Sequence, residues 1–279
     1  MPRSIRPIRV NHMNVVLRDH DVSVAHFAEH FGAEFMVDMP QKEFHASLLE
    51  IGQVIFELFV PHDFLICARY GPHYLGLEWQ ADIDEVRAAV ADHGLGIVRD
   101  IGLALHTDPA DCFGVSHEFY SGYFHANDWE LLGGSKIKSA DWWRDEHPLG
   151  LTGLIGYTHA VEDIAAASAF LQSFLSARPV YEVDRPALGA RAIGLQVADA
   201  LVELQTPRGD GELRQYLNRH GQGIRSTVFG VRDIEQARGF LEGKGIALVL
   251  GSGPGSLAVP AAANLGLMFE FSPESIAAQ

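Results

Sequence analysis

Hydrophobic and polar positions along this chain repeat one pattern four times. In each copy, a strand-like apolar run leads into a stretch with apolar residues at helical spacing, and two or three further strand-like runs follow. The first copy, for example, spaces Val24, Phe27 and Phe31 along one helical face. The pattern predicts four β-α-β-β-β units, at about 9–61, 72–133, 152–207 and 222–273.

Each predicted helix begins near an aspartate, whose side-chain oxygen can cap free backbone N–H groups. The four are Asp19, Asp82, Asp163 and Asp233. One such unit is too small to bury its sheet face alone, so we expect the units to pair.

The predicted fold class is therefore α+β, with four βαβββ modules paired into two tandem domains, each with sheets curved around a cleft. The expected boundaries are 1–133 for the first domain, 134–150 for a linker and 151–279 for the second domain. The tryptophans of this linker, Trp142 and Trp143, indicate that it packs on the surface of the protein.

Charge and composition narrow the classes of function. The 279 residues carry a net charge of -15, and an acidic chain repels the phosphates of nucleic acids and anionic lipids. We therefore expect a small-molecule partner, with no nucleic acid and no membrane. The sequence has no apolar run of roughly 18 residues, and we expect no export signal. Its two cysteines, Cys67 and Cys112, lie outside any CxxC motif. These features favour a cytoplasmic protein.

Each predicted unit closes with an apolar strand that contains a single glutamate. The four are Glu57, Glu130, Glu203 and Glu270. A single strand glutamate usually faces solvent, but four at the same place in four repeats indicate carboxylates that point into a half-apolar cleft. Burial of a carboxylate is costly unless the group is paired, hydrogen-bonded or metal-bound. By contrast, we expect His117 and Glu118 to form a solvated strand pair, and the Gly-rich segment 251–256 to form a hairpin turn.

His12, in the first predicted strand, adds an imidazole to this carboxylate pattern. Imidazole and carboxylates without a thiolate suit Fe(II), Mn(II), Co(II), Ni(II) or Zn(II), and do not separate them.

The His-x6-Asp spacing from His12 to Asp19, with Glu-centred closing strands, resembles the vicinal oxygen chelate superfamily, which includes glyoxalase I, methylmalonyl-CoA epimerase, resistance proteins and extradiol dioxygenases. The resemblance covers about residues 9–273. It implies a divalent metal ion held by the first and last strands of two paired units, here by His12, Glu57, one residue of segment 73–77 and Glu130. For the third position, His73 as a ligand, Tyr74 as a donor or acid, and neither of the two all stay open.

The second pair of units departs from the family pattern. Gly156 and Ser226 stand at the seven-residue spacing where an imidazole is expected, although Glu203 and Glu270 remain. We interpret this half as a degenerate copy that packs against the first. The alternative is a second, metal-free pocket that uses these two glutamates as bases or as hydrogen-bonded scaffolding.

The resemblance implies three alternative functions. A lyase or isomerase of the glyoxalase or epimerase type would act on a small oxygenated substrate through an enolate-like intermediate, with Glu130 as ligand, Glu57 as ligand or base, and Tyr74 near the substrate. A ring-cleaving dioxygenase would hold Fe(II) with His12, His73 and Glu130. A resistance-type protein would bind a small molecule without metal. A homodimer is compatible with each function.

Overall fold

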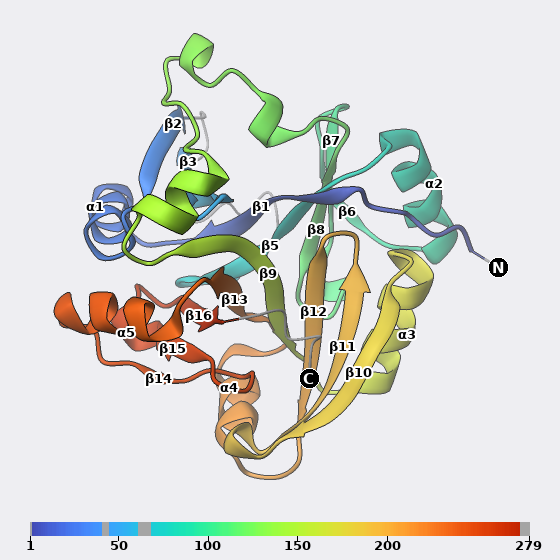
Figure 1. Cartoon of the computed structure of the whole chain (residues 1–279). Helices are drawn as coiled ribbons and strands as arrows, with labels where there is room; N and C mark the ends of the chain where they lie inside the picture. Colours follow the sequence, from blue (N-terminus) through green and yellow to red (C-terminus); the bar gives the residue numbers. More distant parts are fainter. Residues whose placement is uncertain (1, 41–44, 61–67, 274–279) are drawn as a thin grey trace.

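The computed structural model describes residues 2–40, 45–60 and 68–273 of the chain. Within these residues the strands form two sheets of eight strands each, one from each half of the sequence (Figure 1). This arrangement confirms the predicted α+β class of paired βαβββ modules.

The first sheet has the strand order β2-β3-β4-β1-β5-β8-β7-β6. Its centre is the antiparallel pair β1 and β5, and each of these opening strands lies parallel to the closing strand of its own unit. The elements of this half are β1 (Arg9–Val16), α1 (His20–Phe31), β2 (Glu34–Pro40), β3 (His45–Ile51), β4 (Val54–Val60), β5 (His73–Gln80), α2 (Ile83–His93), β6 (Ile97–Asp100), β7 (Ala104–Thr107) and β8 (Ser116–Tyr120).

The second sheet repeats this topology, in the order β10-β11-β12-β9-β13-β16-β15-β14. The additional helix α4 lies between its two units. The elements are β9 (Leu151–Ala160), α3 (Ile164–Phe174), β10 (Arg178–Arg185), β11 (Ala190–Val197), β12 (Ala200–Pro207), α4 (Glu212–His220), β13 (Gly223–Val231), α5 (Ile234–Gly243), β14 (Val249–Leu250), β15 (Leu257–Val259) and β16 (Met268–Ser272).

The four predicted aspartates cap the helices α1, α2, α3 and α5. Asp19 accepts a hydrogen bond from the amide of Val22, and the other three each accept two from amides in the first turn. These caps satisfy N–H groups that a helix leaves free at its start, so they define where each helix begins.

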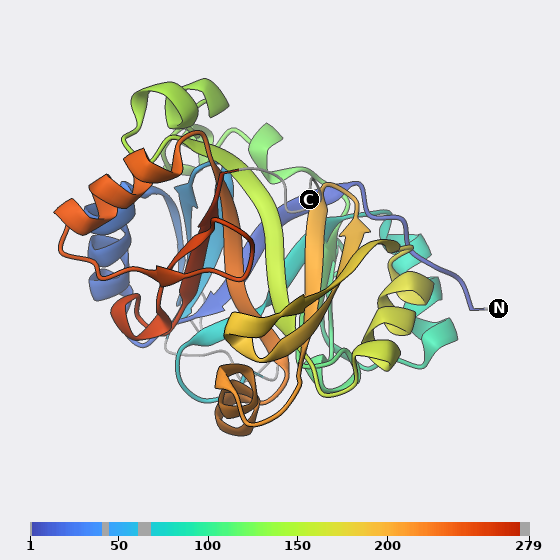
Figure 2. The ribbon, with the colours of Figure 1, turned by 60° about the horizontal axis from the view of Figure 1, so that its bottom comes forward.

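The two halves share one hydrophobic core that runs between the sheets. Phe31 of α1 packs on Phe269 of β16 with ring centroids 5.1 Å apart, and His93 of α2 lies 5.3 Å from Phe174 of α3. Figure 2 shows α2 beside α3 on the right of the molecule. Because this core covers one face of each sheet, strand alternation directs every second side chain to the opposite face.

The segment between the sheets is anchored to the first half. Trp143, fully buried in a short π-helix, donates from its indole N–H to Oε1 of Glu50 at 3.0 Å, and the amide of Lys138 donates to Oε2 of the same carboxylate at 3.0 Å. No helix in the described part of the chain is long and apolar enough to cross a membrane.

Candidate metal centre

Four strands of the first sheet bring one imidazole and three carboxylates together on the face away from the shared core. Nε2 of His12 (β1) lies 3.3 Å from Oε1 of Glu78 (β5), and 3.8 Å from Oε2 of both Glu57 (β4) and Glu118 (β8). The neighbouring residues Met13, Phe56, Leu77 and Phe119 belong to the core. The alternation of these four strands therefore builds the cluster.

The strand register explains why these side chains meet. His12 lies opposite Glu78 in the antiparallel pair, and Glu78 lies beside Glu118 in the parallel pair β5–β8. Glu57 lies beside Asn14, two residues along β1 from His12.

The cluster is buried, and its central imidazole has charged neighbours but no hydrogen bond of good geometry within the described residues. His12 is 1 % exposed, and neither of its ring nitrogens has a hydrogen-bond partner among the described residues; Oε1 of Glu78 has none either. Buried polar atoms normally have a partner, so these atoms indicate a group that the protein binds.

Charge is unevenly shared within the cluster. Burial alone lowers the pKa of His12, but Glu78, Glu118 and Glu57 outweigh it and raise this pKa to about 10. Burial raises the pKa of Glu57 and of Glu78 to about 7 each, against the lowering effect of His12. Burial also opposes ionisation of Glu118, yet His106 and His12 lower its pKa to about 2. Two of the three carboxylates, Glu57 and Glu78, therefore hold their protons more tightly than usual, and a bound cation would favour their ionised forms.

Two further side chains hold the carboxylate of Glu118. Nε2 of His106, from β7, lies 2.9 Å from Oε1, and the side-chain Nδ2 of Asn14 donates to Oε2 at 2.8 Å. The ring of Phe124 packs on His12 at 4.6 Å between centroids. Contacts of this kind orient metal ligands.

The structure brings together two of the predicted ligands, His12 and Glu57. The expected closing strand around Glu130 is wrong: Glu130 starts a short 3-10 helix, Glu130–Leu132, and is exposed. The strand that closes this unit is β8, and Glu118 in β8 has the position that was expected for Glu130. The expectation of a solvated pair at His117 and Glu118 is also wrong, because both are buried.

An internal repeat in the sequence could have identified Glu118. The segment 113–120 reads FGVSHEFY, and the closing segment of the fourth unit, 265–272, reads LGLMFEFS. In both segments a glycine stands four residues before the glutamate, and a phenylalanine follows the glutamate directly. This glycine, Gly114 or Gly266, has a positive φ in the structure.

The other two predicted residues, His73 and Tyr74, lie at the far end of β5 from the cluster. His73 is opposite Val16, four residues along β1 from His12, which corresponds to about 13 Å of strand. Nδ1 of His73 lies 2.7 Å from the carbonyl oxygen of Gly71. The Tyr74 hydroxyl donates to the carbonyl of Met268 at 2.8 Å, so it bridges to the second sheet. The strand β5 contributes Glu78 to the cluster instead.

The glutamates of the second half are already hydrogen-bonded within the protein. Glu203 accepts from the guanidinium of Arg185 at 2.5 Å and from the hydroxyl of Tyr181 at 2.7 Å. Glu270 accepts from Ser226 at 2.6 Å, and Ser226 in turn lies 2.6 Å from Oγ of Thr158. No imidazole takes part in these described contacts, so the second half does not fit a transition-metal site.

Comparison with known proteins gives likeness in structure only. No protein-family model matches the chain, and no curated protein matches its sequence. A variant of 4-hydroxymandelate synthase from Streptomyces coelicolor is similar over 95% of this chain and 92% of its own length, with a TM-score of 0.72 and 14% identity. Methylmalonyl-CoA epimerase from Mycobacterium tuberculosis is 23% identical over 43% of this chain and 87% of its own length, with a TM-score of 0.41. The first likeness extends through both halves and shows the fold.

Proposed function

We propose that this chain, which has the vicinal oxygen chelate fold in two tandem domains, is a metal-dependent enzyme that acts on a small oxygenated organic substrate. The observation that carries the proposal is the buried imidazole of His12, which faces three carboxylates and has no hydrogen bond in the part of the chain that the structure describes. In this proposal residues 1–133 form the working domain, 134–150 the linker and 151–279 the degenerate partner.

The residues present fit a divalent cation. His12, Glu78 and Glu118 offer one ligand atom each, all within 4.8 Å of one another, and all three are buried. Nitrogen and oxygen donors without sulfur suit Mn, Fe, Co, Ni or Zn. When bound, such an ion polarises neighbouring substrate oxygens and stabilises negative charge that develops on them.

The side chains around the cation would divide the remaining work. Glu118 is fixed by His106 and Asn14, which suits a ligand. Glu57 has the most exposed side chain of the three carboxylates, at 14 %, and no hydrogen bond to it is found in the described residues. A carboxylate that is partly accessible and not held can reach a substrate C–H bond, so Glu57 is the candidate base, and ligation by Glu57 is the alternative.

This arrangement favours a lyase or isomerase over the ring-cleaving dioxygenase. The dioxygenase hypothesis needs two imidazoles and one carboxylate on one ion. His73 lies at the other end of β5 and Glu130 is exposed, so that set is not assembled. The dioxygenase stays an outcome of the test because His106 contacts Glu118 and is therefore a second imidazole close to the candidate site.

Metal titration of matched variants tests the proposal. The purified protein is stripped with chelator and titrated calorimetrically with Mn²⁺ and Zn²⁺, beside His12→Ala, Glu118→Gln and the control Glu130→Gln. We expect one site, lost in His12→Ala and weakened at least about tenfold in Glu118→Gln, with Glu130→Gln unchanged. Metal binding that is equal in all four proteins would contradict the proposed site.

Turnover then separates the reaction classes. Metal-dependent exchange of a C–H proton beside a carbonyl with D2O solvent supports the lyase or isomerase. Oxygen consumption with catechols in the Fe(II)-loaded protein would instead support the dioxygenase. Tight binding of a small molecule by protein that takes up no metal would support the resistance-type function.

A further inference from the structure

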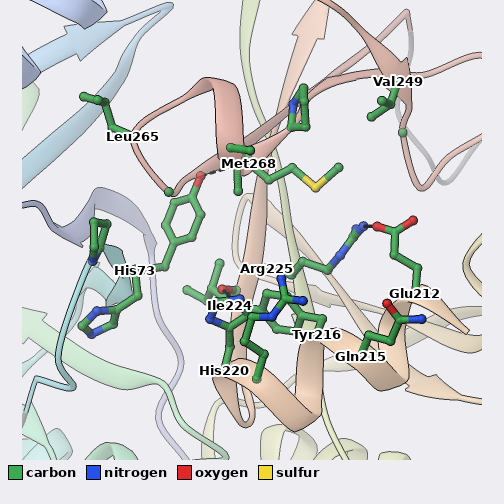
Figure 3. A pocket seen from close by; sticks show the side chains of 18 of the residues that line it. His73, Glu212, Gln215, Tyr216, His220, Ile224, Arg225, Val249, Leu265 and Met268 are labelled. Atoms are coloured by element: carbon green, nitrogen blue, oxygen red, sulfur yellow. Dashed lines mark hydrogen bonds and ion pairs between the residues drawn. The ribbon is translucent and has the colours of Figure 1, made fainter. Parts of the chain in front are cut away.

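A cavity of about 1110 Å³ lies where the second sheet meets the first half of the chain (Figure 3). Its walls come from α4, β13 and the segment before β16, and from the start of β5 and of α1. None of the described residues that line it belongs to the His12 cluster. Its volume is just above the roughly 300–1,000 Å³ of typical small-molecule sites, so it is a candidate binding site separate from the metal centre.

The walls of this cavity are basic, although the chain as a whole is acidic. The chain has 36 acidic and 21 basic residues, but the described lining holds four arginines and only two acidic side chains. The arginines are Arg18, Arg69, Arg219 and Arg225, and the acidic residues are Asp19 and Glu212. Such a reversal of charge favours an anionic ligand.

Arg225 is the one of these arginines that is built into the wall. It lies at a β-bulge in β13, between Ile224 and Ser226, and its side chain is only 4 % exposed. Its Nη2 donates to Oε1 of Glu212 at 2.7 Å, and Nη1 lies 3.7 Å from Oε1 of Glu270. The side chain of Glu212 is 63 % exposed. An incoming anion can therefore displace Glu212 into solvent and take over the guanidinium at little desolvation cost to Glu212.

Beside Arg225, the cavity also has an apolar surface that could contact the uncharged body of a ligand. Figure 3 shows Tyr216, Ile224 and Met268 around the same space. The hydroxyl of Tyr216 donates to the carbonyl of Ile224 at 3.1 Å, and its ring lies 4.9 Å from that of His220, so the aromatic face is held in place. Leu250, at the mouth, is 72 % exposed.

We propose that this cavity binds a small organic acid, with its anionic group on Arg225 and its aromatic or branched apolar body against Tyr216, Ile224 and Met268. The site is independent of the metal centre, because it shares no lining residue with it. It gives the second half, in whose described residues no metal-ligand group is found, a part in a binding site.

Two fluorescent probes that differ in charge test this inference. 8-Anilinonaphthalene-1-sulfonate carries an anionic group on an apolar aromatic body, and N-phenyl-1-naphthylamine is its uncharged counterpart. We expect the full-length protein to bind one equivalent of the sulfonate. Arg225→Gln should weaken that binding by about tenfold or more, because a buried charge-assisted contact is lost, and should change the affinity for the neutral amine less than twofold.

The controls isolate the cavity from the rest of the protein. Arg191→Gln removes a surface arginine that pairs with Glu182, and should leave both affinities unchanged. His12→Ala should also leave them unchanged, so that a failure of the metal centre and a failure of this inference give different results. Leu250→Glu places a carboxylate at the mouth of the cavity on an exposed position, and should weaken binding of the sulfonate more than binding of the amine.

The inference is overturned if Arg225→Gln binds the sulfonate as tightly as the parent protein, or if it loses both probes equally while its melting temperature is retained. Binding of several equivalents of the sulfonate also overturns it. If Arg225→Gln does not fold, Leu250→Glu decides the question. Selective loss of the sulfonate supports the site, and an unchanged affinity overturns it.

Discussion

Replacement of Tyr74 by Phe tests whether this residue serves structure or chemistry. Tyr74 is 3 % exposed, and its hydroxyl joins the first sheet to the second: it donates to the carbonyl of Met268 at 2.8 Å and accepts from the amide of Thr227 at 3.3 Å. Burial raises the pKa of the Tyr74 phenol far above its usual range. The phenol therefore stays neutral at all ordinary pH values, which makes it a poor acid or base.

The size of the effect follows from these two contacts. Each intramolecular hydrogen bond contributes about 0.5–1.5 kcal/mol, and a buried group left without its partner adds to the loss. Because the contact to Thr227 is long, we expect Tyr74→Phe to lower the free energy of unfolding by about 2 kcal/mol. For a chain of this size that corresponds to a fall in melting temperature of about 3–4 °C.

Urea denaturation of the stripped protein measures this loss, and calorimetric titration with Mn²⁺ measures the metal affinity of the same variant. Tyr123→Phe is the control, since its ring lies 4.2 Å from the guanidinium carbon of Arg9 and keeps that contact without the hydroxyl. We expect the control to stay within about 0.5 kcal/mol of the parent protein. Unchanged stability of Tyr74→Phe combined with lost metal affinity would refute the structural role and restore the site role that the sequence predicts.

Three other perturbations test neighbouring parts of the account. Gly76→Ala should reduce both the stability and the metal affinity of the protein, because the added Cβ would lie 1.7 Å from the carbonyl oxygen of Ser116. This clash would push β5, which carries Glu78, away from β8, which carries Glu118. Differential scanning calorimetry measures the loss of stability, and Mn²⁺ titration measures the loss of affinity. Arg185→Met should cost about 3–5 kcal/mol in urea denaturation, since it leaves the buried carboxylate of Glu203 without its cation, and should leave metal affinity unchanged; a loss below about 1 kcal/mol would contradict this ion pair. Burial raises the pKa of Glu50 to about 7 from 4.5, against its hydrogen bonds from Lys138, Trp143 and Gln53, so the folded state holds this proton more tightly than the unfolded state does. The resulting stabilisation is present below pH 4.5 and is lost as the pH rises through 7, so the stability of the parent protein relative to Glu50→Gln should fall across this interval; a flat difference would contradict the raised pKa.

The alternation and spacing of apolar residues predicted most of the fold, because the helix and strands of each βαβββ unit are determined by the local sequence. The capping aspartates, for example Asp19 and Asp233, fixed the starts of the helices. The exception was the end of the second unit. There Trp129, Leu131 and Leu132 surround Glu130 and imitate a closing strand, although the residues form a 3-10 helix.

The metal centre was harder to predict because it depends on pairing between strands far apart in the sequence. Spacing from the helix start places His12 correctly, but the partner of His12 on β5 is set by the antiparallel register, which pairs it with Glu78. His106 lies on a strand of a unit whose closing glutamate was misplaced, so its contact with Glu118 was not foreseen. The cavity around Arg225 results from the packing of the halves and of α4, which no local pattern encodes.

The central claim is that one cation binds between strands of the first sheet. Crystals of the protein soaked with Mn²⁺, with diffraction recorded at the manganese edge, test it most directly. The account predicts one anomalous peak at about 2.0–2.3 Å from Nε2 of His12 and from carboxylate oxygens of Glu78 and Glu118. The absence of a peak there at saturating Mn²⁺, or a peak only at the partly exposed group of His20, Asp38 and His45, would contradict it.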